Sequence, residues 1–164
     1  MPEPTHGDGR APVLYETPVL AEWVDYNGHM SEAYYVLVAG FTTDALLDRI
    51  GMDDAFRRRT GHSMYTLEAH ITYLREVREG EPLSVTTRVV AVDHKRMHLF
   101  HDIRHAEQDH SIATEELVAC NVDAATSRSA PLLPEIGSAL QELHRAHLRL
   151  PPDERLGRHI GLRR

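Results

Sequence analysis

This chain of 164 residues has one cysteine, no net positive charge and no long apolar run. Each of these features argues against one class of protein. The single cysteine, Cys120, cannot form an intramolecular disulfide, which suits a reducing compartment. The formal net charge of −7 disfavours a nucleic-acid surface. No apolar run reaches membrane length, and Met1–Gly9 lacks the apolar core of a signal peptide, so we expect a cytoplasmic location.

Several catalytic motifs are missing as well. Without a Gly-x-Ser-x-Gly elbow or a glycine-rich phosphate loop, serine hydrolysis, nucleotide hydrolysis and dinucleotide redox chemistry have no basis. Twelve histidines suggest a metal site, and His94, His98, His101 and His105 lie close together in sequence. In a strand, however, His98 and His101 face opposite sides, and neither a cysteine nor paired carboxylates complete a ligand set. We therefore expect no metal and no cofactor.

The length and a hydrophobic content of 41% predict a single globular domain. Residues 1–12 are polar and rich in proline and glycine, which predicts a disordered leader. The domain is expected to span residues 13–150. Residues 151–164 then form a basic tail, which we interpret as a solvated end.

The first half of the domain is expected to contain a strand and a long helix. Pro18 interrupts the apolar stretch Val13–Val24, which favours an edge strand or a bulged one. Residues of Ala33–Phe41 are apolar or small on all sides, so this segment is expected to be a core helix wrapped by other structure and ended near Gly51. Asp53–Arg59 is interpreted as a short helix or loop.

The second half alternates with a period of two, as strands do. In the first such strand one face is expected to carry Tyr65, Leu67, Ala69, Ile71 and Tyr73, and the other Thr66, Glu68, His70 and Thr72. Three further strands follow within residues 83–123, joined by short links, and a peripheral helix is predicted over residues 135–150. One long helix followed by consecutive strands indicates an α+β domain, with the helix packed on an antiparallel sheet.

Chemically useful groups gather immediately before the long helix, where Asp25, Asn27, Gly28 and His29 lie within five positions. Gly28 lets the backbone turn closely, and Ser31 can cap the helix through its hydroxyl. A helix start of this kind can stabilise a developing negative charge. The alternative is an ordinary strand-to-helix turn, which uses the same residue types.

The run Asp25-x-x-Gly28-His29-Met30-Ser31 resembles the signature at the start of the central helix in hotdog-fold acyl-CoA thioesterases of the 4-hydroxybenzoyl-CoA type. Many members carry Asn where this chain has Ser31. Four further stretches, residues 41–47, 65–70, 80–83 and 95–101, resemble the betainyl-CoA thioesterases of carnitine breakdown, which also occur fused to carnitine 3-dehydrogenase. The resemblance covers residues 13–135 and implies a hotdog fold, a curled antiparallel sheet wrapped around one long central helix.

By this resemblance Asp25 takes the position of the catalytic carboxylate, acting as nucleophile or general base in thioester hydrolysis. Asn27 would hold the attacking water or the carbonyl, and the backbone of Gly28, His29 and Met30 would bind the oxyanion. His29 either orients Asp25 or only caps the turn. Two alternatives from other classes are a hotdog acyl-CoA hydratase and a non-catalytic acyl-CoA-binding module.

A betainyl group would require recognition of a trimethylammonium ion, for which aromatic faces and one carboxylate are the available means. The residues expected to supply them are Trp23, Tyr26, Tyr34, Tyr65 and Glu68. The alternative is that the aromatic residues are core, that Glu68 is solvated, and that the substrate is a neutral short-chain or aromatic acyl-CoA. Arg57–Arg59 could contact the CoA phosphates or form a solvated face. The resemblance also implies a homodimer or homotetramer, with the active site completed across a subunit interface.

Overall fold

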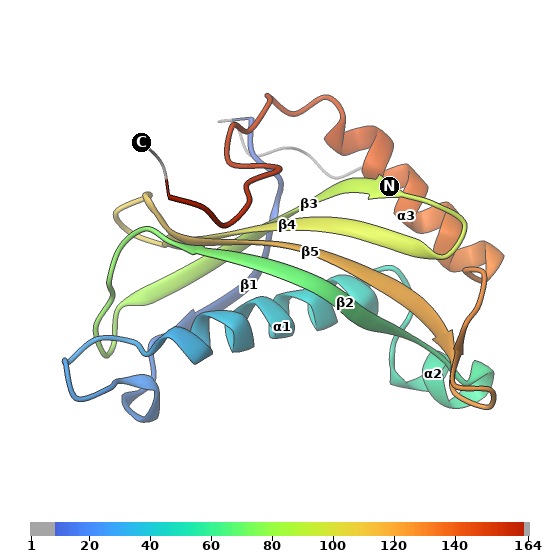
Figure 1. Ribbon diagram of the computed structural model, residues 1–164, viewed down its shortest axis with the longest axis horizontal. Helices are drawn as coiled ribbons and strands as arrows, with labels where there is room; N and C mark the ends of the chain where they lie inside the picture. The colour runs from blue at the N-terminus through green and yellow to red at the C-terminus, as the bar shows by residue number, and fades with distance from the viewer. Residues whose placement is uncertain (1–8, 163–164) are drawn as a thin grey trace.

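The computed structural model describes residues 9–162 and consists of one curled antiparallel sheet with the long helix α1 along its concave face (Figure 1). The strands follow the order β1-β3-β4-β5-β2, and the short β6 pairs with β5. This arrangement confirms the expected hotdog architecture and the α+β class. The strands are β1 (Val13–Pro18), β2 (His62–Tyr73), β3 (Pro82–Val92), β4 (Arg96–His105), β5 (Ser111–Asp123) and β6 (Arg128–Ser129). The helices are the 3-10 turn η1 (Ala21–Trp23), α1 (Glu32–Arg49), α2 (Asp54–Thr60) and α3 (Pro134–His147).

The two ends of α1 are built differently. Ser31 occupies the N-cap position, but its side chain makes no capping hydrogen bond, so the predicted hydroxyl cap is wrong. At the other end Gly51 adopts φ +86°, as predicted for the residue that ends this helix. The N–H of Gly51 donates to Asp48 O at 3.1 Å and that of Met52 to Leu47 O at 2.8 Å, which turns the chain sharply toward α2.

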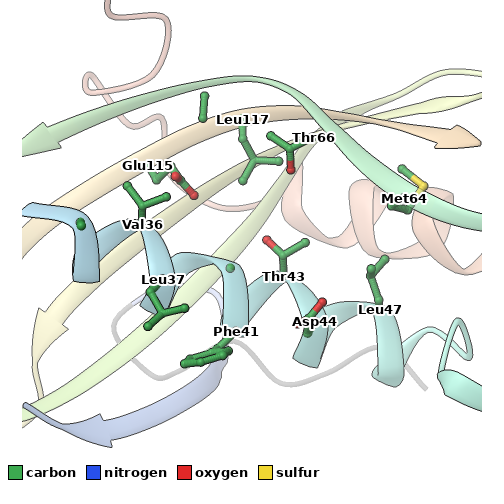
Figure 2. A pocket seen from close by; sticks show the side chains of 13 residues that line it. Val36, Leu37, Phe41, Thr43, Asp44, Leu47, Met64, Thr66, Glu115 and Leu117 are labelled. Atoms are coloured by element: carbon green, nitrogen blue, oxygen red, sulfur yellow. The ribbon is translucent and has the colours of Figure 1, made fainter. Parts of the chain in front are cut away.

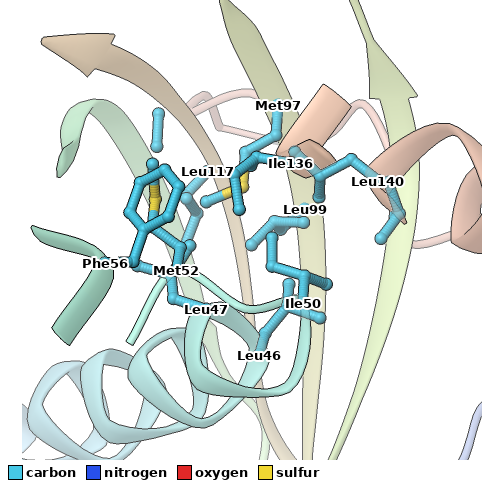
Figure 3. Packing of buried hydrophobic residues seen from close by; sticks show 12 residues of the cluster. Leu46, Leu47, Ile50, Met52, Phe56, Met97, Leu99, Leu117, Ile136 and Leu140 are labelled. Atoms are coloured by element: carbon cyan, nitrogen blue, oxygen red, sulfur yellow. The ribbon is translucent and has the colours of Figure 1, made fainter. Parts of the chain in front are cut away.

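The core consists of two apolar clusters on the concave face, one at each half of α1. Around the N-terminal half, Tyr35 and Val38 pack with Trp23 of η1 and with inward residues of the strands. Around the C-terminal half, Leu46 and Leu47 meet Met97, Leu99, Ile136 and Leu140, so that α1, the sheet and α3 share one cluster (Figure 3). Burying each of these large side chains contributes about 1.5–3 kcal/mol.

One side of α1 is not covered by the described chain. Val36, Leu37 and Phe41 are 45%, 39% and 38% exposed, although their sequence is apolar. The expectation that other structure wraps the helix on all sides is therefore wrong for the single chain. The exposed side of α1 lies next to β2, the edge strand at one end of the sheet.

A bulge in β2 changes the predicted facing of its side chains. Thr66 is opposite Ala119 and Glu68 is opposite Val118, so Leu67 is an extra residue in the strand. Beyond the bulge, Ala69 faces inward, as the alternation predicted. Before the bulge the pattern is reversed, since Thr66 faces the helix and Tyr65 faces away from it.

Helix α3 covers the part of β3 that β1 leaves unpaired. The Val89 N–H donates to Nδ1 of His147 at 2.9 Å, and Nδ1 of His144 lies 3.2 Å from Val89 O. Two histidines therefore satisfy the backbone of an otherwise open strand edge. Along the same edge of β3, β1 is an edge strand with a bulge near its start and Pro18 at its end, as predicted.

The segment after α3 crosses the convex face of the sheet instead of extending into solvent, which corrects the expected solvated tail (Figure 1). Arg155 bonds both oxygens of Asp102 at 3.0–3.1 Å and lies over the Phe100 ring. The Gly157 N–H donates to Glu116. Of the predicted leader, residues 1–8 lie outside the described residues, whereas Ala11 is buried. Across residues 9–162 no helix is long and apolar enough to span a membrane.

Candidate active site

The loop before α1 is a tight, hydrogen-bonded turn that presents Asp25. Val24 and Met30 form an isolated bridge, and the Asp25 N–H donates to His29 O at 2.9 Å. Within the turn the Gly28 N–H donates to Asp25 O at 2.9 Å, and Gly28 adopts φ +79°, which favours glycine. The Asn27 N–H donates to Oδ1 of Asp25 at 2.8 Å, so the carboxylate is oriented by its own loop.

His29 does not orient Asp25. Its Nε2 lies 3.3 Å from Oε1 of Glu76, in the segment between β2 and β3. Of the two roles left open by the sequence, holding the turn in place fits this contact. Burial raises the pKa of Tyr35 to about 12, with smaller contributions from neighbouring charges. Asp25 is one of these charges, so the two side chains lie near each other. Tyr35 therefore stays protonated.

Two of the three expected oxyanion donors are already occupied. The Gly28 N–H is used within the turn, and the Met30 N–H donates to Val77 O at 2.8 Å. Within residues 9–162, by contrast, the N–H groups of His29, Glu32 and Ala33 have no acceptor. These three donors surround the first turn of α1, where the helix dipole is positive.

A groove of about 600 Å³ opens between the exposed side of α1 and strands β2 and β5 (Figure 2). It begins at Ala33 in the first turn of the helix and extends to Leu47 and Met64. Its wall is mostly apolar, and its two ionisable residues are both acidic. The groove is lined by Ala33, Val36, Leu37, Gly40, Phe41, Thr43, Asp44, Leu47, Met64, Thr66, Ala69, Glu115 and Leu117.

None of the residues that line this groove was predicted as a site residue from the sequence, and Glu115, on β5, is the buried ionisable one among them. It is only 3% exposed, and burial raises its pKa to about 7. Figure 2 shows its carboxylate pointing into the space between the sheet and α1. The alternation of this strand could have predicted that Glu115 faces inward. It shares one face with Ala113 and Leu117, which are both apolar and buried.

The expected substrate-binding residues are not brought together in the single chain. Trp23 is buried and stacks on Tyr34 at 5.7 Å, within the core. Tyr26 is 97% exposed on the loop before α1. Because of the β2 bulge, Tyr65 and Glu68 lie on the face of the strand opposite the groove. These five side chains therefore do not form a cage around a ligand within one chain.

The arginines of α2 have separate local roles. Arg57 donates to Met52 O at 2.8 Å, Arg58 pairs with Asp54, and Arg59 lies over the Phe56 ring. Arg58 and Arg59 remain at the surface beyond the Leu47 end of the groove.

The histidines of β4 are not arranged as metal ligands. His98 pairs with Glu116 on the convex face, whereas His101 is fully buried on the concave one. Nε2 and Nδ1 of His101 lie 3.0 and 2.8 Å from the hydroxyls of Thr43 and Thr87, and burial lowers the pKa of His101 to about 4. In the part of the chain that the structure describes, no group of three or more metal-ligating side chains is found.

Comparisons with known proteins identify the family. The model of the thioesterase-like superfamily matches residues 19–140. The betainyl-CoA thioesterase of Pseudomonas aeruginosa is 43% identical over 148 residues, which cover 90% of this chain and 93% of that protein. The L-carnitine dehydrogenase/betainyl-CoA thioesterase of Rhizobium meliloti is 41% identical over 92% of this chain, which spans only 30% of that longer protein.

Solved structures support the same assignment. A putative thioesterase from Pseudomonas putida KT2440 is 37% identical, with a TM-score of 0.82 over 94% of this chain and 98% of that one. A hypothetical protein of Staphylococcus aureus, solved in complex with CoA, shares the fold with a TM-score of 0.87 over the same shares at 24% identity. The chain therefore belongs to the thioesterase-like superfamily and is a thioester hydrolase with the hotdog fold.

Proposed function

We propose that this thioester hydrolase acts on betainyl-CoA and releases glycine betaine and CoA. The observation that carries the proposal is the 43% identity to a betainyl-CoA thioesterase over nearly the whole length of both chains. The groove supports it independently, because its ionisable residues, Asp44 and Glu115, are both acidic, as a cationic acyl group would require.

In the proposed reaction Asp25 either attacks the thioester carbonyl or removes a proton from the attacking water. Both routes develop negative charge on the carbonyl oxygen. The free N–H groups of His29, Glu32 and Ala33 would stabilise that charge at the positive end of the α1 dipole. Asn27, exposed on the same loop, would position the water or the carbonyl.

We further propose that the working enzyme is a homodimer or a multiple of it. Strand β2 is an uncovered edge with Leu67 61% exposed, and the adjacent side of α1 exposes Val36, Leu37 and Phe41. A long apolar edge next to an apolar helix face is costly to leave in water. A second copy of the chain, related by a two-fold axis perpendicular to β2, would cover both features at once.

This assembly would also complete the active site. Asp25 does not line the groove of its own chain. If the two β2 strands pair antiparallel, the Tyr73 end of one strand meets the His62 end of the other. The His62 end of the second chain would then close the Ala33 end of the groove, beside the loop that carries Asp25 and on the side where Glu115 lies opposite Ile71. The same pairing would bring Arg58 and Arg59 near the start of the other α1, where they could bind CoA phosphates.

The experiment that tests the proposed substrate is thiol release from a panel of CoA thioesters. We expect kcat/KM for betainyl-CoA to exceed that for acetyl-, butyryl- and benzoyl-CoA by more than ~10-fold. Equal rates across the panel would leave a thioesterase of neutral acyl-CoA and remove the betainyl assignment. A hydratase or a non-catalytic binding module would release no thiol from any of them.

We also propose that the reaction takes place in the cytoplasm. Cys120 is buried and unpaired, as suits a reducing compartment.

A further inference from the structure

Glu115 is a buried carboxylate without a counter-ion. Within the described residues no cation pairs with it and no donor bonds it, although it is only 3% exposed. An unpaired buried charge is costly and is kept in natural proteins where it serves a ligand or a reaction. The carboxylate lies in the wall of the groove, so a ligand in the groove can reach it (Figure 2).

The titratable groups around Glu115 do not supply the missing positive charge. His101 lies directly opposite it on β4, but that ring is held between two threonine hydroxyls and stays neutral. On β2, Tyr73 is close enough for its pKa to be raised by burial and by the charges of Glu32 and Glu115. Asp44, on the α1 side of the groove, is exposed and also acidic.

The walls near Glu115 suit methyl groups rather than hydrogen-bonding groups. Val36, Ala69 and Leu117 are apolar, and Gly40 leaves open space on the helix side, since a Cβ there would meet nothing within 4 Å. A trimethylammonium ion needs such a site, because it has no N–H to donate and its charge is spread over its methyl surface. Its recognition therefore requires apolar contact and a fixed negative charge at close range.

We propose that Glu115 is the counter-ion for the trimethylammonium group of the substrate, which lies in the groove against Val36, Gly40 and Leu117. The inference rests on the proposed betainyl-CoA substrate and deepens it by assigning its specificity to one carboxylate. It replaces Glu68, the carboxylate expected from the sequence, which lies on the other face of β2.

The test compares betainyl-CoA with 3,3-dimethylbutyryl-CoA, in which a carbon atom replaces the quaternary nitrogen, so that shape is kept and charge is removed. At pH 8 we expect Glu115→Gln to lower kcat/KM for betainyl-CoA at least ~30-fold, as loss of one partner of a buried charge pair does. The same variant should change kcat/KM for the neutral thioester less than ~3-fold, because it retains the shape of the site.

The matched control is Glu16→Gln, which removes an exposed carboxylate from β1, and which should leave the ratio of the two substrates unchanged. An equal loss on both substrates would overturn the inference, since Glu115 would then serve catalysis or folding. Unchanged ratios in Glu115→Gln would overturn it as well. If the wild type itself prefers the neutral thioester, the proposed function fails first, and the two failures are thereby distinguished.

A second measurement does not depend on the stability of the variant. In the wild type, glycine betaine should inhibit hydrolysis of 3,3-dimethylbutyryl-CoA at least ~10-fold more strongly than 3,3-dimethylbutyrate does. Equal inhibition by the two acids would contradict a carboxylate counter-ion in the groove.

Discussion

The carboxyl group of Glu115 should lower the stability of the ligand-free protein as it ionises. Burial raises its pKa from 4.5 to about 7, so between these values the folded chain holds a proton that the unfolded chain has released. The stabilising contribution of the protonated Glu115 carboxyl group is thus fully present below pH 4.5, and it is lost as the pH rises through 7.

We therefore expect Glu115→Gln to be more stable than the wild type at pH 8, by about 1–3 kcal/mol, and nearly equal to it at pH 4.5. Urea denaturation at both pH values measures the difference. A variant that is less stable than the wild type at pH 8 would show that Glu115 is not an unpaired charge.

Two residues near the groove differ in how well local sequence signals predict their positions. The position of Asp25 before a long helix was correctly predicted, because turns and apolar periodicity are local signals. The extra residue Leu67 in β2 was not predicted, because a bulge depends on how the partner strand pairs. Because of this extra residue, Thr66 faces the groove and Tyr65 faces away from it. The predicted aromatic cage for the trimethylammonium group was therefore assigned to the wrong face of β2.

At the scale of elements, the contact between α3 and β3 depends on two histidines. His147 accepts a hydrogen bond from Val89 N only while its Nδ1 is unprotonated. Burial, with smaller contributions from Arg88 and His144, lowers the pKa of His147 to about 4. Because the folded pKa is depressed below 6.5, this contribution to stability is present above pH 6.5 and is lost as the pH falls through 4.

His147→Ala leaves the Val89 N–H without an acceptor and should lower the free energy of unfolding by about 1–3 kcal/mol at pH 7.5. The loss should shrink as the pH approaches 4. Urea denaturation is the measurement, with the exposed His159→Ala as control, for which no change is expected. A constant difference between pH 7.5 and 4 would contradict the assigned bond.

The order of the elements was more predictable than their partners. Consecutive strands with short links correctly indicated the antiparallel sheet and the β3–β4 hairpin. That β2 pairs with β5 across the sheet is a long-range choice, and local periodicity carries no information on it. The basic tail was misjudged for the same reason, since the partners of Arg155 lie in β4, in β5 and in the tail itself.

At the scale of the whole molecule, the exposed side of α1 predicts an oligomer. Light scattering of the wild type should give at least twice the chain mass of 18.6 kDa. Leu37→Glu places a charge on this face and should yield a folded monomer with little thioesterase activity, because burying an unpaired charge at an interface is costly. Leu148→Glu, at a 68% exposed position away from this face, is the control and should remain oligomeric. An active wild-type monomer would contradict the proposed assembly.

The exposure of α1 in the single chain differs from what its apolar sequence predicts, and this difference points to a partner. The sequence of α1 predicts a helix that is covered on all sides, and the described chain covers only part of it. Both statements hold if the missing cover is a second copy of the same chain. The groove, the acidic wall and the loop that carries Asp25 would then belong to one shared site.

The proposed hydrolysis of betainyl-CoA depends most directly on Asp25. The decisive measurement is thiol release from betainyl-CoA by the wild type and by Asp25→Asn under identical conditions, with circular dichroism and light scattering to confirm equal folding and assembly. We predict that the variant retains both and loses at least ~100-fold in kcat, the scale expected for a positioned acid–base or nucleophilic group. Near-wild-type turnover by Asp25→Asn would contradict the account and leave the loop as an ordinary turn before the helix.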